Sequence, residues 1–176
     1  SGVDGSCAIT VKRLDNGAYS RWLTDVAKPG DKLLTTGAAG LFTLPEDNRR
    51  YEQVFFFAAG IGITPVFSLI KALLHRQPEQ HAVLIYSNRS KEEVVFYNEI
   101  SVLAAQFPDR FKVEFLYSTS FNLARARLSK TLLPLLVKEY AAVAIPRMLF
   151  YICGPYDYMR MAILSLEEQG VDEAQV

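Results

Sequence analysis

The chain has 176 residues, half of them apolar, which suits one compact domain or two small ones. Nineteen basic and nineteen acidic residues give a formal net charge of zero, so no long-range positive field is available to attract nucleic acid or an anionic membrane. No run of about 20 apolar residues is present, and Cys7 and Cys153 have no metal-ligand spacing. We therefore expect no nucleic-acid partner, no membrane insertion and no metal site, and the two isolated cysteines indicate a reducing cytoplasm.

The first part of the chain has the pattern of short strands separated by glycine turns. Strands are expected at 8–14, 32–36 and 41–44, and a short helix over 18–26. This pattern indicates part of an antiparallel barrel, which we place at 1–45, followed by a polar linker over 45–50.

From residue 51 the pattern changes to alternating strands and helices. Strands are expected at 52–58, 82–87, 111–117 and 148–152, and helices at 64–76, 92–106, 128–140 and 156–169. Pro134 lies inside the third helical pattern, where it is expected to kink or delay the helix. Alternation with apolar strands implies parallel crossovers, so 51–176 is predicted to be an α/β domain with a Rossmann-like parallel sheet and helices on both faces.

Two glycine turns carry the main functional signal. Gly60-Ile61-Gly62-Ile63-Thr64-Pro65 and Cys153-Gly154-Pro155 each follow an apolar run and precede a helical pattern. Such turns present bare backbone N–H groups at the carboxyl edge of a parallel sheet, where nucleotides bind. A dinucleotide site is the leading hypothesis, with a plain strand-helix turn as the alternative for either segment alone. The Thr64 hydroxyl could cap its helix or contact a ligand.

The end of the second strand indicates which dinucleotide binds. Ser87-Asn88-Arg89-Ser90 stands where a dinucleotide fold normally offers an acidic residue for the ribose. An arginine with two hydroxyls fits a 2′-phosphate better, which favours NADPH over NADH. A solvated loop is the alternative, and Glu92 or Glu93 could pair with Arg89 instead. Arg125 and Arg127 could add a second cationic wall or be ordinary surface residues.

Cys153 is not expected to act as a nucleophile. A reactive thiol needs a nearby base, and the two histidines, His75 and His81, do not follow a strand's carboxyl end. A small polarisable side chain at that edge could pack against a flat cofactor ring, and the alternative is a buried small hydrophobe.

Taken together, these segments resemble the ferredoxin–NADP reductase-like superfamily of flavoproteins. The matching motifs, in family order, are Gly17-Ala18-Tyr19-Ser20, Gly37-Ala38-Ala39-Gly40-Leu41-Phe42, Gly60 to Pro65, and Cys153-Gly154-Pro155 with Met159. Tyr86-Ser87-Asn88-Arg89-Ser90 and Phe96 resemble most closely the oxygenase-reductase branch, which includes reductases of the phenylacetyl-CoA epoxidase and phenol hydroxylase type.

The resemblance implies an FAD-binding barrel followed by an NAD(P)-binding domain with strand order 3-2-1-4. It implies that Gly17, Ala18, Tyr19 and Ser20 bind the FAD pyrophosphate, and that Thr64 and Cys153 lie beside the nicotinamide at the site of hydride transfer. The implied NAD(P)-binding residues are Gly60, Ile61, Gly62, Ile63, Thr64, Pro65, Ser87, Asn88, Arg89, Phe96, Arg127, Cys153, Gly154, Pro155 and Met159.

The implied function is that of an NAD(P)H-dependent flavoprotein oxidoreductase, the reductase component of a larger system. Hydride would pass from NAD(P)H to FAD, and electrons would pass on to an iron–sulfur or flavodoxin-type acceptor protein. Alternatives are a reductase of haem or free flavin, and a nucleotide-binding electron-transfer or regulatory subunit without turnover. The family's R-x-Y-S motif and last strand have no counterpart here, so the chain is expected to be a piece of a longer protein that holds FAD weakly. A [2Fe-2S] domain would also lie outside it.

Overall fold

The computed structural model describes residues 8–37, 39–45 and 50–176. Strands and helices alternate beyond residue 50, as expected. The strands are β1 (Gln53–Ala59), β2 (His81–Asn88), β3 (Phe111–Tyr117) and β4 (Met148–Cys153). The helices are α2 (Ile63–Arg76), α3 (Tyr97–Gln106), α4 (Leu132–Tyr140) and α5 (Tyr156–Glu167). Single 3-10 turns are η1 (Gly60–Gly62), η2 (Lys91–Glu93), η3 (Leu123–Arg125), η4 (Ile145–Arg147) and η5 (Glu173–Gln175).

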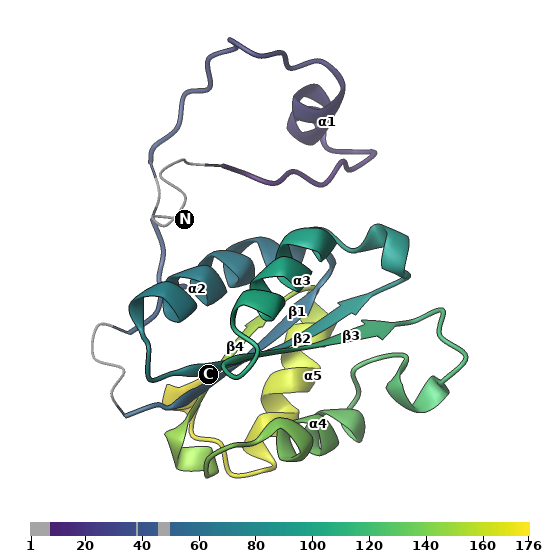
Figure 1. Ribbon diagram of the computed structural model, residues 1–176. Helices are drawn as coiled ribbons and strands as arrows, with labels where there is room; N and C mark the ends of the chain where they lie inside the picture. The colour runs from purple at the N-terminus through teal and green to yellow at the C-terminus, as the bar shows by residue number, and fades with distance from the viewer. Residues whose placement is uncertain (1–7, 38, 46–49) are drawn as a thin grey trace.

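The four strands form one parallel sheet in the order β3-β2-β1-β4, which confirms the predicted order. The sheet is covered on both faces: α2 and α3 lie on one side and α4 and α5 on the other (Figure 1). Central strand β1 therefore has no solvent-facing side, and residues 54–58 are fully buried. This explains why its sequence is a continuous apolar run and does not alternate.

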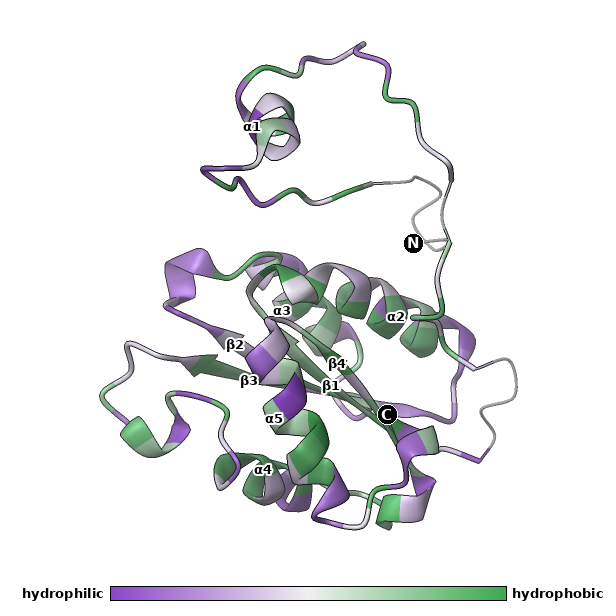
Figure 2. Ribbon diagram, turned by 180° about the vertical axis from the view of Figure 1, so that it is seen from behind, coloured by the Kyte–Doolittle hydropathy of each residue, from purple (hydrophilic) through white to green (hydrophobic). Residues whose placement is uncertain are grey.

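The core is divided by the sheet into two layers. Phe56 and Tyr86 pack with α2 and α3, whereas Phe55, Phe57 and Phe150 pack with α4 and α5. Figure 2 shows the strands as mostly hydrophobic between helices that carry both hydrophobic and hydrophilic residues. No helix in the described part of the chain is both long and apolar enough to span a membrane.

Two helices begin later than their patterns predicted. The helix expected over 92–106 starts at Tyr97, because Val94 is extended and Phe96 has a left-handed backbone with φ 62°. The helix expected over 128–140 starts at Leu132 and carries Pro134 in its first turn. Proline is tolerated there because the first N–H groups of a helix have no intrahelical partner, so the expected delay is confirmed.

The strands expected in the first part of the chain were wrong. Helix α1 (Ala18–Asp25) forms, but no strand is assigned in the described residues before 50. A strand needs a hydrogen-bonding neighbour, and this segment loops out from the α/β body with apolar side chains such as Leu34 and Leu41 almost fully exposed (Figure 1). Cys7, Ala38 and most of the expected linker over 45–50 lie outside the described residues.

One contact ties the end of this segment to the sheet. The Tyr151 hydroxyl on β4 donates to the Thr43 carbonyl oxygen over 2.6 Å, and the Phe42 ring packs edge-on against the Tyr151 ring at 5.3 Å. The end of this segment is therefore held against β4 on the side of the sheet covered by α2 and α3.

Candidate nucleotide-binding site

The two glycine turns lie against each other at the carboxyl edge of the sheet. Strands β1 and β4 are neighbours, and their ladder ends at the pair Ala58 and Cys153. A Cβ atom built on Gly62 would overlap the Cys153 carbonyl oxygen, and one built on Gly154 would lie 2.9 Å from the Ala59 Cβ. Glycine fits both positions because Gly62 touches the backbone of Cys153 and Gly154 touches the Ala59 and Tyr158 side chains. These contacts explain the two glycines without any reference to a ligand.

An open cavity of about 430 Å³ lies over the joined turns. Its lining residues are Ala59, Gly60, Ile61, Gly62 and Pro65 from the first turn, Cys153, Gly154 and Pro155 from the second, and Lys12. Helix α2 begins here, so its positive end and first N–H groups favour an anion. Lys12 carries the one charged side chain among the described lining residues. The sequence analysis missed it, because a single lysine in an apparent strand gives no signal of where the fold brings it.

Three buried polar atoms at this edge make no hydrogen bond of good geometry within the described chain. They are Thr64 Oγ1 in the first turn of α2, and Ser87 Oγ and Asn88 Nδ2 at the end of β2, of which the last two lie near the hydroxyls of Tyr158 and Tyr86. A buried polar group without a partner is destabilising, so such groups are normally satisfied by protein, water or ligand. Their position beside the glycine turns fits a polar ligand such as a dinucleotide.

A second cavity of about 370 Å³ adjoins the first and shares Ala59 and Pro155 with it. It is lined further by Ser87, Asn88, Ser118, Ala126, Arg127, Leu128 and Tyr158. The ends of β1 and β2 and the residue after β3 therefore contribute to one pair of adjoining cavities. The structure brings Ser87, Asn88 and Arg127 together here, although they are up to 40 residues apart in the sequence.

Cys153 ends β4 and lines the first cavity, where its side chain is half-buried. Burial raises the pKa of its thiol, so the neutral form is favoured near neutral pH. His75 packs edge-on against Phe107 at 5.3 Å near the end of α2, and His81 starts β2, so both lie toward the opposite edge of the sheet. No histidine lines either cavity among the described residues, as expected from their places in the sequence.

Residues 56–163, more than half of the chain, match the model of the oxidoreductase NAD-binding domain. The chain belongs to this family. Its parallel sheet, with the glycine turn after β1, is thus that of an oxidoreductase NAD-binding domain.

Curated relatives of this chain include reductase components of oxygenases. The ferredoxin reductase component of 3-ketosteroid-9-alpha-monooxygenase from Rhodococcus rhodochrous is 31% identical over 99% of this chain and 46% of its own length. The glycine betaine monooxygenase reductase subunit of Pseudomonas aeruginosa is 29% identical over 97% of this chain and 46% of its own length. The chain therefore spans about half the length of the relatives it matches.

Solved structures share the fold. The Amycolatopsis cytochrome P450 reductase GcoB superposes with a TM-score of 0.76 at 21% identity, covering 94% of this chain and 49% of the other. The CS-b5R domains of human Ncb5or in the NAD⁺ form give a TM-score of 0.75 at 21% identity, covering 94% of this chain and 46% of the other.

Arg89 lies at the edge of this site and not inside it. Its side chain is 75% exposed, lines neither cavity and has its Nε 4.0 Å from Glu93 Oε1, one of the pairings considered above. The Arg89 carbonyl oxygen accepts hydrogen bonds from the Thr119 N–H at 3.1 Å and the Thr119 hydroxyl at 2.9 Å. An exposed pair at this distance is weak, so the guanidinium can turn to another anion.

The two arginines after β3 have different roles. Arg125 is held by Glu114 at 3.1 Å and Glu139 at 3.0 Å, and the hydrogen bond that it donates to Glu139 raises the pKa of its guanidinium. Arg127 is exposed and lines the second cavity. Of the cationic wall considered above, Arg127 alone faces the site.

Three expected residues contribute packing and line neither cavity. The Phe96 ring stacks on Phe67 at 5.3 Å, Met159 packs against the α4/α5 core, and Ile63 is fully buried. Any contact of these residues with a nucleotide stays a prediction.

The residues expected to hold the FAD pyrophosphate form a compact turn. The Ser20 hydroxyl donates to the Gly17 carbonyl oxygen at 3.0 Å and accepts from the Leu14 N–H at 3.2 Å. This hydroxyl thus stabilises the turn. The main-chain N–H groups at the start of α1 have no partner within the helix and are available to a phosphate. These residues line neither of the two cavities described above. The described part of the chain contains no cluster of three or more metal-ligating side chains.

Proposed function

We propose that this chain is the NAD(P)H-binding part of a flavin-dependent reductase that supplies electrons to a partner protein. The observation that carries the proposal is the joined pair of glycine turns, which places a helix start and Lys12 around one cavity, with the unpartnered Thr64 hydroxyl in the first turn of the same helix. The printed names of the relatives, a ferredoxin reductase component and a reductase subunit, support it.

The chain's own residues would bind and orient the nucleotide. Gly60 and Gly62 let the backbone approach the pyrophosphate closely, while the positive end of α2 and the Lys12 ammonium stabilise its charge. Thr64 and Cys153 would flank the nicotinamide ring, with the Thr64 hydroxyl gaining the hydrogen-bond partner that the protein does not provide.

When bound, the two cofactors would supply the chemistry, a hydride transfer from nicotinamide to flavin followed by release of single electrons. The chain would provide orientation, and no described carboxylate or histidine lines either cavity. The neutral Cys153 thiol fits this role, because it can contact a flat ring without introducing charge.

The adenosine half would occupy the second cavity. Ser87, Asn88 and Arg127 line it, and Arg89 at its rim would pair with a 2′-phosphate. NADPH is therefore the proposed coenzyme. An iron–sulfur or flavodoxin-type protein, or a fused iron–sulfur domain, is the proposed acceptor, and the cytoplasm is the proposed location.

The test is to mix full-length protein with NADPH or NADH and follow flavin absorbance by stopped flow, then follow ferricyanide reduction in the steady state. Rapid flavin bleaching with catalytic ferricyanide reduction is expected. Nucleotide binding without flavin reduction would instead favour the alternative function, a nucleotide-binding subunit that has no turnover of its own.

A further inference from the structure

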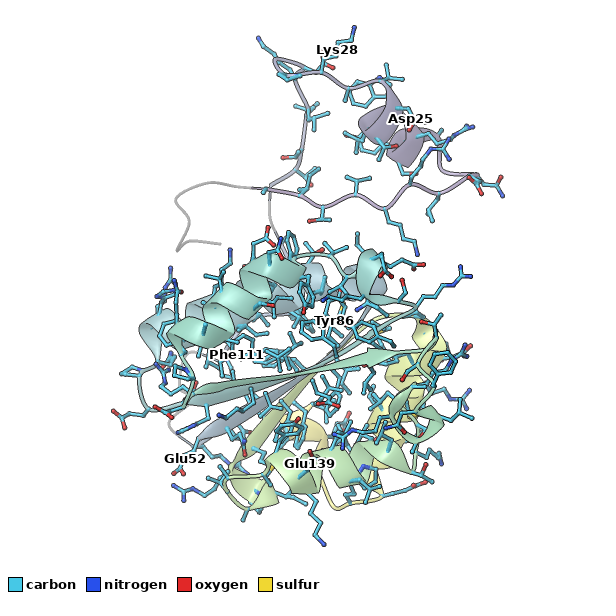
Figure 3. All side chains as sticks on the ribbon, turned by 45° about the vertical axis from the view of Figure 1, so that its right-hand side comes forward. Asp25, Lys28, Glu52, Tyr86, Phe111 and Glu139 are labelled. Carbon is cyan, nitrogen blue, oxygen red and sulfur yellow. The ribbon has the colours of Figure 1, made fainter. Side chains whose placement is uncertain are left out.

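A buried tyrosine hydroxyl holds the first glycine turn. Tyr86 on β2 is fully buried on the side of the sheet covered by α2 and α3, where Figure 3 labels it. Its hydroxyl donates to the Gly60 carbonyl oxygen over 2.9 Å. The same carbonyl also accepts from the Ile63 N–H, so it lies between the tyrosine and the start of α2.

Packing alone does not fix the conformation of Gly60. Its φ is +54°, and a Cβ built on it would meet no atom within 4 Å. Gly62 differs, because its α-carbon is wedged against Cys153. The direction of the Gly60 peptide therefore depends on its hydrogen bonds, of which the Tyr86 bond is the one made by a side chain.

A second tyrosine holds the strand just before the turn. The Tyr158 hydroxyl, from α5 on the opposite face, donates to the Ala58 carbonyl oxygen at 3.2 Å. The β1–β4 ladder ends at Ala58, where the strands part around the cavity. The carbonyls on either side of Ala59 are thus each held by a phenol, one from each face of the sheet.

We propose that Tyr86 is a positioning residue for dinucleotide binding, which acts through Gly60 and is supported by Tyr158 from the other face. The inference rests on the proposed function. A glycine peptide visits both signs of φ readily, so without the tyrosine bond the turn would populate conformations in which its N–H groups no longer face the pyrophosphate. Apparent affinity falls with the fraction of protein in the competent conformation. Burial raises the pKa of Tyr86 to about 12, which keeps the donor proton in place at neutral pH.

The test is Tyr86→Phe in the full-length protein, with dissociation constants measured by calorimetry. The probes are NADP⁺ and its adenosine fragment 2′-phospho-AMP, or NAD⁺ and AMP if the wild type prefers them. The dinucleotide should bind about three- to ten-fold more weakly, as expected for one lost hydrogen bond. The fragment does not reach the glycine turn, so its affinity should fall clearly less, through the lost contact of the Tyr86 hydroxyl with Asn88 alone.

Tyr51→Phe is the matched control, because its hydroxyl also donates to a main-chain carbonyl, that of Ala174, but just before β1 at the other end of the strand. Tyr51→Phe should change neither the affinity for the dinucleotide nor the affinity for the fragment. Gly60→Ala provides a second measurement: if Tyr86 acts through Gly60, the double variant should lose no more dinucleotide affinity than Gly60→Ala alone.

Unchanged dinucleotide affinity in Tyr86→Phe, or equal loss for the dinucleotide and the fragment, would overturn the positioning role. A wild-type protein that binds neither dinucleotide would instead reject the proposed function on which the inference rests.

Discussion

The α-carbon of Gly62 lies directly against the main-chain carbonyl of Cys153. A Cβ at Gly62 would overlap the carbonyl oxygen, lie 2.6 Å from its carbon and 3.0 Å from the Gly154 nitrogen. The opposing atoms are backbone atoms, which cannot rotate away as a side chain would. The turns after β1 and β4 therefore form one unit, and a change at either should disturb both halves of the site.

Gly62→Ala should destabilise the protein and also weaken NAD(P)H binding. Forcing a methyl group into this contact is expected to destabilise by about 1–3 kcal/mol, by the usual effect of overpacking. Gly60→Ala is the matched comparison: its Cβ would meet open space, so only the left-handed backbone contributes, about 1 kcal/mol. Urea denaturation of the full-length variants measures both, and a Gly62 variant as stable as the Gly60 variant would contradict the contact.

The body of the fold could be predicted from the sequence because its signals are local. Continuous apolar runs predicted β1, β2 and β4, and the glycine turns predicted which edge of the sheet carries the candidate site. Lys12 could not be found in this way, since it reaches the cavity through tertiary structure alone. The ion pairs of Arg125 with Glu114 and Glu139 could not be predicted either, because they join separate elements of the fold. The strands at 8–14 and 32–36 failed because a strand pattern cannot show whether a neighbouring strand is present.

Cys153→Ser should slow flavin reduction while preserving the fold and most NAD(P)H affinity. Serine nearly keeps the volume but places a more strongly hydrated hydroxyl beside the nicotinamide. Because transfer depends on close alignment, a small displacement can reduce the rate by roughly 100-fold. Stopped-flow reduction of the full-length protein is the measurement, and an unchanged rate would leave Cys153 a packing residue.

The same measurement made across pH tests the ionisation state of the thiol. Burial raises the pKa of Cys153, so the thiolate fraction is lower than for a free cysteine and deprotonation is shifted to higher pH. Flavin reduction should show no cysteine ionisation between about pH 6 and 9. A thiolate-dependent rise that disappears in Cys153→Ser would argue for covalent chemistry.

Lys12→Gln should weaken NADPH and NADH to a similar degree, because the proposed contact is with the pyrophosphate that both share. Loss of a charge-assisted contact of about 1.5 kcal/mol corresponds to roughly ten-fold weaker binding. Lys28→Gln is the control: it removes the same charge from an exposed lysine that does not line the cavity. Equal affinities in the two variants would show that Lys12 plays no part.

Arg89→Ala should weaken NADPH more than NADH. A lost contact with the 2′-phosphate is expected to reduce NADPH affinity by about 1.5–3 kcal/mol, roughly ten- to a hundred-fold. Glu93→Gln removes the competing carboxylate 4.0 Å from Arg89 and should not weaken NADPH. The discriminating quantity is the ratio of the two dissociation constants, and an unchanged ratio in Arg89→Ala would make it a surface residue.

Arg127→Met should weaken nucleotide binding, whereas Arg125→Met should mainly reduce stability. Arg127 lines the second cavity. Arg125 pairs with Glu114 and Glu139, so its replacement leaves both carboxylates without their cationic partner. Dissociation constants and thermal midpoints of both variants separate the roles. The opposite assignment, with Arg125 controlling affinity, would require a different path for the adenosine half.

The most direct test of the account is a crystal structure of the full-length protein with bound NADP⁺. We predict pyrophosphate density over Gly60 and Gly62 at the start of α2, with Lys12 in contact and the nicotinamide between Thr64 and Cys153. A dinucleotide bound elsewhere, with the cavity over the joined glycine turns left to solvent, would contradict the central claim.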